Sequence, residues 1–186
     1  MRNNTFTIVL PDWVEKFLKS QPIAYRTIED RMRLAIELSR LNIEYRSGGP
    51  FGAAIFDNHS GELISVGINL VVSCRCSTAH AEMVAFALAQ QALSTHDLAS
   101  KGDFQLATSC QPCAMCLGAT PWSGVKSIIC GARGKDAEAI GFDEGAKPAD
   151  WVKELQNRGI EVKLDILRME ARAVLDNYKS DGGIIY

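Results

Sequence analysis

The chain of 186 residues predicts a three-layer α/β/α fold built on a mixed sheet of about five strands. Segments with apolar residues at helical spacing alternate with short apolar runs of strand length, and this alternation is typical of layered α/β proteins. The length suits one compact domain, residues 1–186, with a substantial core. Apolar residues make up 47% of the chain and charged residues 23%, the ordinary balance of a globular protein.

The first elements follow from periodicity and from helix-breaking residues. Residues 1–25 are expected to form an appended segment with a helix that packs on the domain. Apolar residues recur at helical spacing over 28–46 and predict a long amphipathic helix. Two glycines and a proline within 47–50 cannot continue it, so the helix is expected to end there.

A hairpin and a second helix are expected next. Residues 52–56 and 63–67 flank a cluster of turn residues and predict two antiparallel strands. A helix is then predicted from about His80 to Leu93, with Ser77 or Thr78 as its N-terminal cap.

The C-terminal half alternates strands and helices. Strands are predicted over 104–108, 127–130 and 160–164, and helices from Pro112, over 149–158 and over 168–178. Proline is favoured in the first turn of a helix, which suits Pro112. Pro121 should stop or kink the helix that Pro112 begins.

Charge and hydropathy limit the classes of partner. The formal net charge is −2 and no run of like charge occurs, which argues against a nucleic-acid surface built from clustered Lys and Arg. The first ten residues lack the apolar core of a signal peptide, and no apolar stretch is long enough to span a membrane. We therefore expect a cytoplasmic protein that binds no membrane.

Two short motifs carry the chemistry. His80-Ala81-Glu82 and Pro112-Cys113-Ala114-Met115-Cys116 supply one imidazole and two thiols, the ligand types that zinc prefers. Three protein ligands leave the fourth position of a tetrahedral zinc open for water, which distinguishes a catalytic zinc from a structural one. Glu82 is not needed as a ligand, and it lies close enough to move a proton of that water.

The spacing of these residues supports one site. Cys113 and Cys116 are three residues apart, so both sulfurs leave the same face of a helix. In the first turn of that helix the unpaired N–H groups favour thiolate over thiol. The pattern H-x-E…P-C-x-x-C is the signature of zinc-dependent base deaminases, which remove an amino group by hydrolysis. The sequence therefore predicts one Zn²⁺ held by His80, Cys113 and Cys116.

The remaining cysteines and histidines leave other interpretations open. Six cysteines could form three disulfides, but three of them lie within seven residues, which favours metal chemistry. Cys110 is the only candidate for a fourth ligand in a closed, non-catalytic zinc module, and the proline that follows it argues against that role. The others, Cys74, Cys76 and Cys130, are expected to be small buried apolar residues, and His59 and His96 surface residues.

The chain resembles the cytidine deaminase-like superfamily over nearly its whole length after Tyr25, and more narrowly the bacterial guanine deaminases that also accept aminotriazines. Stretches that carry the resemblance are 48–53, 67–69, 78–82, 108–116, 122–123 and 139–145. The resemblance implies hydrolysis of guanine to xanthine and ammonia, activity on triazines such as ammeline, and a homodimer.

The resemblance also assigns residues to the substrate. It implies that Asn69 and the backbone N–H of Ala81 hydrogen-bond the edge of the purine. Phe51 and Phe142 are expected to supply apolar faces, with the planar base between them.

Three further residues come from the same resemblance. Glu144 corresponds to a second proton carrier that protonates the departing amine, and Asp143 to a partner of that exocyclic amine. Tyr186, in the apolar C-terminal segment, is expected to close over the site. The family usually has Glu before the Pro-Cys pair, whereas this chain has Gln111, which keeps a hydrogen bond but no charge.

Other substrates use the same zinc chemistry. A nucleoside deaminase acting on guanosine or cytidine is the main alternative, because tolerance of ribose depends on loop shape. A tRNA or DNA deaminase is disfavoured by the acidic balance of the chain.

Overall fold

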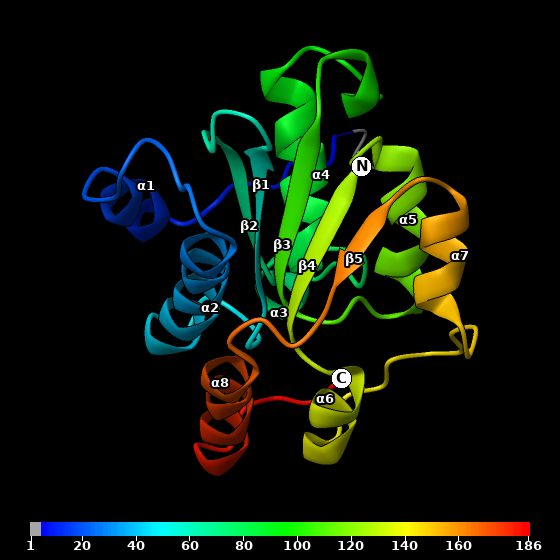
Figure 1. The fold of residues 1–186 in the computed structure, drawn as a ribbon. Coiled ribbons are helices and arrows are strands. Elements are labelled where there is room, and N and C mark those ends of the chain that lie inside the picture. The colour runs from blue at the N-terminus through cyan, green and yellow to red at the C-terminus, as the bar shows by residue number, and fades with distance from the viewer. Residues whose placement is uncertain (1–4) are drawn as a thin grey trace.

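The computed structural model describes residues 5–186 and contains a five-stranded sheet in the order β2-β1-β3-β4-β5 (Figure 1). The strands are β1 (Gly52–Asp57), β2 (Leu63–Ile68), β3 (Phe104–Cys110), β4 (Ser127–Ala132) and β5 (Glu161–Lys163). β1 is antiparallel to both β2 and β3, while β3, β4 and β5 run parallel to one another. The predicted mixed sheet of five strands is confirmed.

Helices cover both faces of the sheet (Figure 1). They are α1 (Asp12–Leu18), α2 (Ile28–Glu44), α3 (Val71–Cys74), α4 (Ala81–Ala92), α5 (Ala114–Ser123), α6 (Gly134–Ile140), α7 (Trp151–Asn157) and α8 (Arg168–Ser180), with a 3₁₀ turn at Leu98–Ser100. α2 packs on β1 and β3, and α8 packs on β4, while α4 packs on β1 and β2 from the other side. The three predicted layers are therefore present.

The alternation of side chains along β1 explains the two layers. Ala54 and Phe56 are buried in the core that includes α2 and α8. Ala53 and Ile55 are buried in the core that includes α4. Because successive side chains of a strand point to opposite faces, a central strand between two helix layers must be apolar on both.

The described part of the N-terminal segment packs on the core. Trp13 and Val14 of α1 are buried in the same core as α2. The indole N–H of Trp13 donates to Ser47 Oγ at 2.8 Å, and its ring stacks on Tyr45 with centroids 5.2 Å apart. Residues 1–4 lie outside the described part of the chain. None of the helices over residues 5–186 is long and apolar enough to cross a membrane.

Two expectations about helix N-termini are wrong in detail. α4 is not capped by Ser77 or Thr78, because His80 itself is the N-cap residue and its side chain makes no capping hydrogen bond. Pro112 lies before α5 rather than in its first turn, since Cys113 is the N-cap of that helix. Both shifts place a predicted zinc ligand at a helix boundary, where its ring or sulfur is directed into the site.

Pro121 does not stop α5, which continues to Ser123. A proline removes one backbone hydrogen bond, and only two helical residues follow it here, so little of the helix is affected. Gly124 then ends the helix in the left-handed conformation, with φ 85°. The short helices α3 and α6 were not predicted, because four and seven residues give too little periodicity to recognise.

Candidate active site

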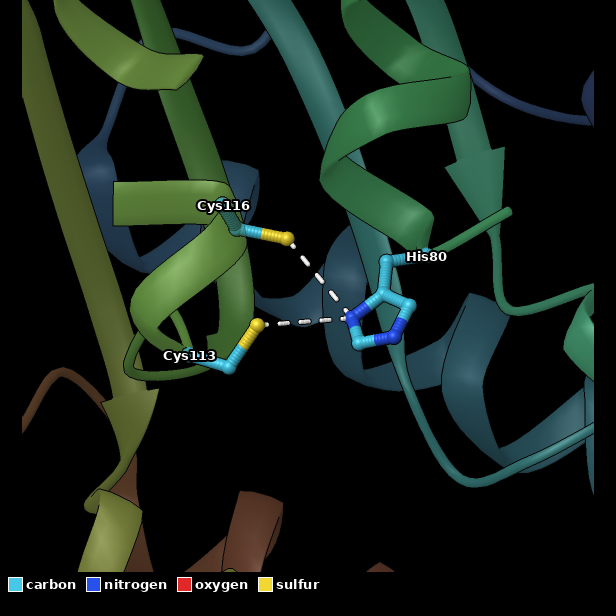
Figure 2. Close-up of side chains that lie close together, drawn as sticks. All are labelled: His80, Cys113 and Cys116. Carbon is cyan, nitrogen blue, oxygen red and sulfur yellow. Dashed lines mark hydrogen bonds between the residues drawn. The ribbon is translucent and has the colours of Figure 1, made fainter. Parts of the chain in front are cut away.

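The N-termini of α4 and α5 meet at the three predicted metal ligands, whose side chains point toward one another (Figure 2). His80 precedes the first turn of α4, Cys113 precedes that of α5, and Cys116 is the third residue of α5. His80 Nδ1 lies 3.5 Å from Cys113 Sγ and 3.7 Å from Cys116 Sγ. The three ligand atoms all lie within 4.8 Å of one another.

These separations fit zinc. A tetrahedral zinc with a Zn–S bond of about 2.3 Å and a Zn–N bond of about 2.0 Å places sulfur and nitrogen about 3.5 Å apart. The observed 3.5 and 3.7 Å match that spacing, so these three side chains fit one Zn²⁺. Cys110 lines the same cavity but is not part of this ligand cluster.

The local environment favours the ionised thiol at Cys113. A hydrogen bond with the Cys116 thiol is the main cause that lowers the pKa of Cys113 to about 4. His80 lowers it further by a hydrogen bond and by its charge. Thiolate is the form that binds metal.

Two carboxylates flank the ligands, and both are almost fully buried. The exposed fraction is 6% for Glu82 and 6% for Glu144. Burial, reinforced by the negative charge at Cys113, raises the pKa of Glu82. Burial raises the pKa of Glu144 to about 7, although the Lys147 ammonium opposes the shift. Such perturbed carboxyl groups in a cavity are typical of catalytic acids and bases.

The cavity between these groups is lined by Phe51, Asn69, His80, Glu82, Cys110, Gln111, Cys113, Phe142, Asp143, Glu144 and Tyr186. Most residues assigned to the substrate by resemblance are therefore brought to the predicted metal site. Tyr186 donates from its hydroxyl to Asn69 Oδ1 at 2.6 Å, and its ring meets that of Phe142 edge to face at 5.4 Å. The C-terminal residue Tyr186 thus lies at the cavity.

The expected stacking of a base between Phe51 and Phe142 is not possible in this arrangement. Their centroids are 4.9 Å apart with an interplanar angle of 71°, so the two rings contact each other edge to face. A base inserted between them needs roughly twice the van der Waals contact distance of about 3.5 Å. Both rings instead form one apolar wall of the cavity.

Ala81 and Asp143 are placed less directly. Ala81 is fully buried and its side chain does not line the cavity, but its N–H belongs to the first turn of α4, where helix N–H groups have no intrahelical partner. Asp143 lines the cavity as an exposed residue, and its Oδ1 accepts from Gly145 N at 2.8 Å.

Two residues around the site, Lys147 and Asn42, make contacts that were not predicted from the sequence. Lys147 forms an ion pair with Glu144 at 3.0 Å, and the spacing of three residues between them was the available signal. Asn42, fully buried in α2, donates at 2.8 Å to the carbonyl oxygens of both Gly49 and Asn69. Gln111 Oε1 accepts from Gly134 N at 3.1 Å, so the expected hydrogen bond of this amide is present without a charge.

The other cysteines and histidines largely follow expectation. Cys130 is fully buried, and His59 and His96 are exposed. Cys74 and Cys76 are half-buried rather than fully buried, because they lie in the loop at α3 on the edge of the core.

The fold and the site together define the class of this protein. The family model described as "Cytidine and deoxycytidylate deaminase zinc-binding region" matches residues 25–132, and the chain belongs to this family. It is a zinc-dependent hydrolytic deaminase, with His80, Cys113 and Cys116 fitting the zinc site.

More particular similarities point to one branch. The chain is 38% identical to guanine deaminase of Bacillus subtilis (strain 168) over 116 residues, which cover 62% of this chain and 71% of the relative. A solved structure of guanine deaminase from Nitrosomonas europaea is 46% identical, with a TM-score of 0.90, and the match covers 97% of this chain and 99% of that one. A related structure in complex with 2,6-diaminopurine is 46% identical, with a TM-score of 0.92 over 100% of this chain and 98% of that one.

A second branch is also similar. The tRNA-specific adenosine deaminase of Buchnera aphidicola is 30% identical over 129 residues, which cover 69% of this chain and 79% of that protein.

Proposed function

We propose that this protein hydrolyses guanine to xanthine and ammonia. The observation that carries the proposal is a single cavity that joins the three zinc ligands to two buried carboxylates, Glu82 and Glu144. The cavity also holds Asn69, an amide suited to the hydrogen-bonding edge of a purine. The similarity to two bacterial guanine deaminases supports guanine as the substrate.

The two carboxylates divide the proton transfers. Zinc held by His80, Cys113 and Cys116 would supply an activated water for attack on C2 of the base. Glu82 accepts a proton from the attacking water and delivers it to a ring nitrogen. Glu144, with a pKa near 7, is partly protonated at neutral pH and donates its proton to the departing amino group. The C2 hydroxyl gives its remaining proton to Glu82, which is ionised again after the first transfer, and the C2 carbonyl of xanthine forms as ammonia leaves.

The other assigned residues hold the base. Asn69 and the N–H of Ala81 bind the purine edge, while Phe51 and Phe142 supply the apolar wall. Asp143, at the exposed rim, contacts the exocyclic amine as it leaves. Tyr186 closes over the cavity and keeps bulk water away from the reacting atoms.

Small aminotriazines such as ammeline, which present a planar ring with exocyclic amines, are proposed as further substrates of the same site. Nucleosides, guanosine or cytidine, form the alternative substrate class. The contact between Tyr186 and Asn69 favours free bases, because a ribose needs space at the mouth of the cavity.

Similarity to tRNA-specific adenosine deaminases makes RNA a second candidate substrate. The net charge of −2 disfavours it, because RNA binding draws affinity from clustered Lys and Arg. We therefore propose a small molecule as substrate, with a role in purine catabolism.

We also propose that residues 1–186 act as one deaminase domain, in the cytoplasm, and as a homodimer. The packing of α1 on the core supports the single domain. The dimer rests on resemblance to guanine deaminases, and sedimentation of the purified protein tests it.

The decisive experiment is ammonia release by zinc-loaded protein from guanine, guanosine, cytidine, ammeline and a tRNA containing adenosine at the wobble position. We expect the highest kcat/KM with guanine. Faster turnover of a nucleoside or of the tRNA would contradict the proposal and select the corresponding alternative.

A further inference from the structure

Lys147 joins the second carboxylate to the zinc-binding loop. Its Nζ lies 3.0 Å from Glu144 Oε2 and donates to the carbonyl oxygen of Pro112, also at 3.0 Å. Pro112 immediately precedes the ligand Cys113. One ammonium group therefore links the segment that carries Glu144 to the segment that carries a zinc ligand.

This lysine differs from the other paired lysines of the described chain in its burial. Its side chain is 14% exposed, whereas Lys19 and Lys163 in their ion pairs are 71% and 47% exposed. Exposed pairs contribute little and hold no fixed geometry, because solvent screens them. A largely buried ammonium with two partners has a better defined position than an exposed one.

The neighbouring residues leave room for this position. A Cβ at Gly134 would lie 2.9 Å from Lys147 Nζ and 3.3 Å from Glu144 Oε2, so the absence of a side chain there makes space for the pair. Gln111 Oε1 lies nearby and accepts from the N–H of Gly134. Because Gln111 is neutral, it offers no second carboxylate to compete with Glu144 for the ammonium.

A backbone contact reinforces the link. The N–H of Ala114, the first residue of α5, donates to the carbonyl oxygen of Glu144 at 2.9 Å. This bond fixes the main chain at Glu144, but it leaves the carboxyl group free to rotate. The contact with Lys147 is the one that fixes the carboxyl group itself.

We infer that Lys147 is a positioning residue for deamination. It holds the Glu144 carboxyl group at a fixed place relative to Pro112 and Cys113 of the zinc-binding segment. The inference rests on the proposed function, because it assumes that Glu144 transfers a proton. Displacement of a catalytic group by about 1 Å can cost on the order of 100-fold in rate. Loss of the ammonium should therefore lower kcat more than it changes KM.

Lys147→Met tests this role, because Met retains most of the length of the side chain without the charge. We expect kcat with guanine to fall about 10- to 100-fold, with KM within about threefold of the wild-type value. Zinc stoichiometry should remain one per chain, since the three ligands are unchanged. Lys147→Arg retains a cation and should lose less activity. Lys163→Met, which removes an exposed paired lysine, is the matched control and should behave as the wild type.

A double-mutant cycle separates positioning from general destabilisation. If Lys147 acts through Glu144, then adding Lys147→Met to Glu144→Gln should change kcat by less than about threefold, because coupled residues are not additive. Additive losses, an unchanged kcat in Lys147→Met, or a loss of kcat that parallels loss of zinc would each overturn the inference. Absence of guanine turnover in the wild type would instead overturn the proposed function, and this role with it.

Discussion

At the scale of single residues, the cavity contains two buried carboxyl groups, Glu82 and Glu144, with different neighbours. Glu82 lies among the zinc ligands, and the negative charge at Cys113 reinforces the effect of burial on its pKa. Glu144 is equally buried but is paired with a cation, Lys147. Carboxyl groups in unlike environments can hold opposite protonation states at one pH, which allows one to act as base and the other as acid.

Replacing Glu82 by Gln should abolish its proton transfer while preserving its volume. We expect kcat to fall by about 10²- to 10⁴-fold, the usual contribution of a general base. Zinc content, measured by atomic absorption, should stay at one ion per chain. Loss of zinc in this variant would instead make Glu82 a ligand. Glu154→Gln, an exposed glutamate of α7, provides the matched control.

The pKa of Glu144 predicts the pH dependence of turnover. The carboxyl group has a pKa of about 7, above its usual value, so it is protonated below pH 7 and ionised above it. A proton donor is active in its protonated form, and kcat should therefore decline as pH rises through about 7. A pH–rate profile measures this limb. If kcat of the Glu144→Gln variant still declines as pH rises through about 7, the decline is caused by another group.

At the scale of elements, the zinc site depends on the close approach of β2 and α4. Gly67 of β2 faces the first residue of α4, and a Cβ at Gly67 would lie 1.9 Å from the carbonyl oxygen of Ala81. No side chain can occupy that space unless the backbone moves. The contact therefore sets the position of the helix that carries His80 and Glu82.

Gly67→Ala should displace α4 from the sheet. We expect a loss of about 1–3 kcal/mol in the free energy of unfolding, the usual cost of overpacking, and weaker zinc binding in a competition with a chelator. Chemical denaturation measures the first quantity. A variant with wild-type stability and zinc affinity would show that α4 can adjust without cost.

Gly118→Ala is the contrasting change for that experiment. Gly118 lies within α5, and a Cβ there meets no atom within 4 Å. Because alanine restricts the unfolded chain and favours the helix, we expect a gain of about 0.5–1 kcal/mol. Zinc affinity should not change, and a destabilised Gly118→Ala variant would contradict this expectation.

At the scale of the whole molecule, distant segments complete the cavity. Tyr186 and Asn69 are 117 positions apart in the chain, yet their side chains are hydrogen-bonded. Asn42 of α2 adds a third segment, because its amide donates to the carbonyl oxygens of Gly49 and Asn69. This side of the cavity therefore forms only after α2, the segment that follows β2 and the C-terminus have packed together.

Deletion of residues 182–186 should open the cavity. We expect KM for guanine to rise about tenfold, equivalent to about 1.4 kcal/mol, with a smaller rise for Tyr186→Phe, which keeps the ring but loses the hydroxyl. Steady-state kinetics of the two variants give the comparison. Unchanged KM and kcat after the deletion would remove the C-terminus from the site.

The zinc ligands and the fold class were predictable because their signals are local. Cys113 and Cys116 lie one helical turn apart, and His80 precedes an amphipathic segment, so short-range spacing alone brings the correct ligand types to helix starts. The five strands were recognised from apolar runs for the same reason. Helix boundaries were less accurate, because His80 and Cys113 are the N-cap residues although neither side chain makes a capping hydrogen bond. Capping propensity therefore does not identify them.

The sequence by itself thus determined the metal, its three ligands, the nearby Glu82 and the layered sheet, since each is marked by a short motif or apolar run, although His80 and Cys113 are 33 positions apart and only the tertiary structure brings them together. Tertiary structure alone decided that Phe51 and Phe142 contact each other, that Lys147 holds Glu144 and that Tyr186 covers Asn69. Two of these contacts join residues far apart in the chain, and the third depends on burial of a short loop. Neither periodicity nor spacing encodes the two distant contacts, because they form only when separate elements pack together. The spacing of three residues between Glu144 and Lys147 is visible in the sequence, but the burial of the pair beside the zinc ligands is not.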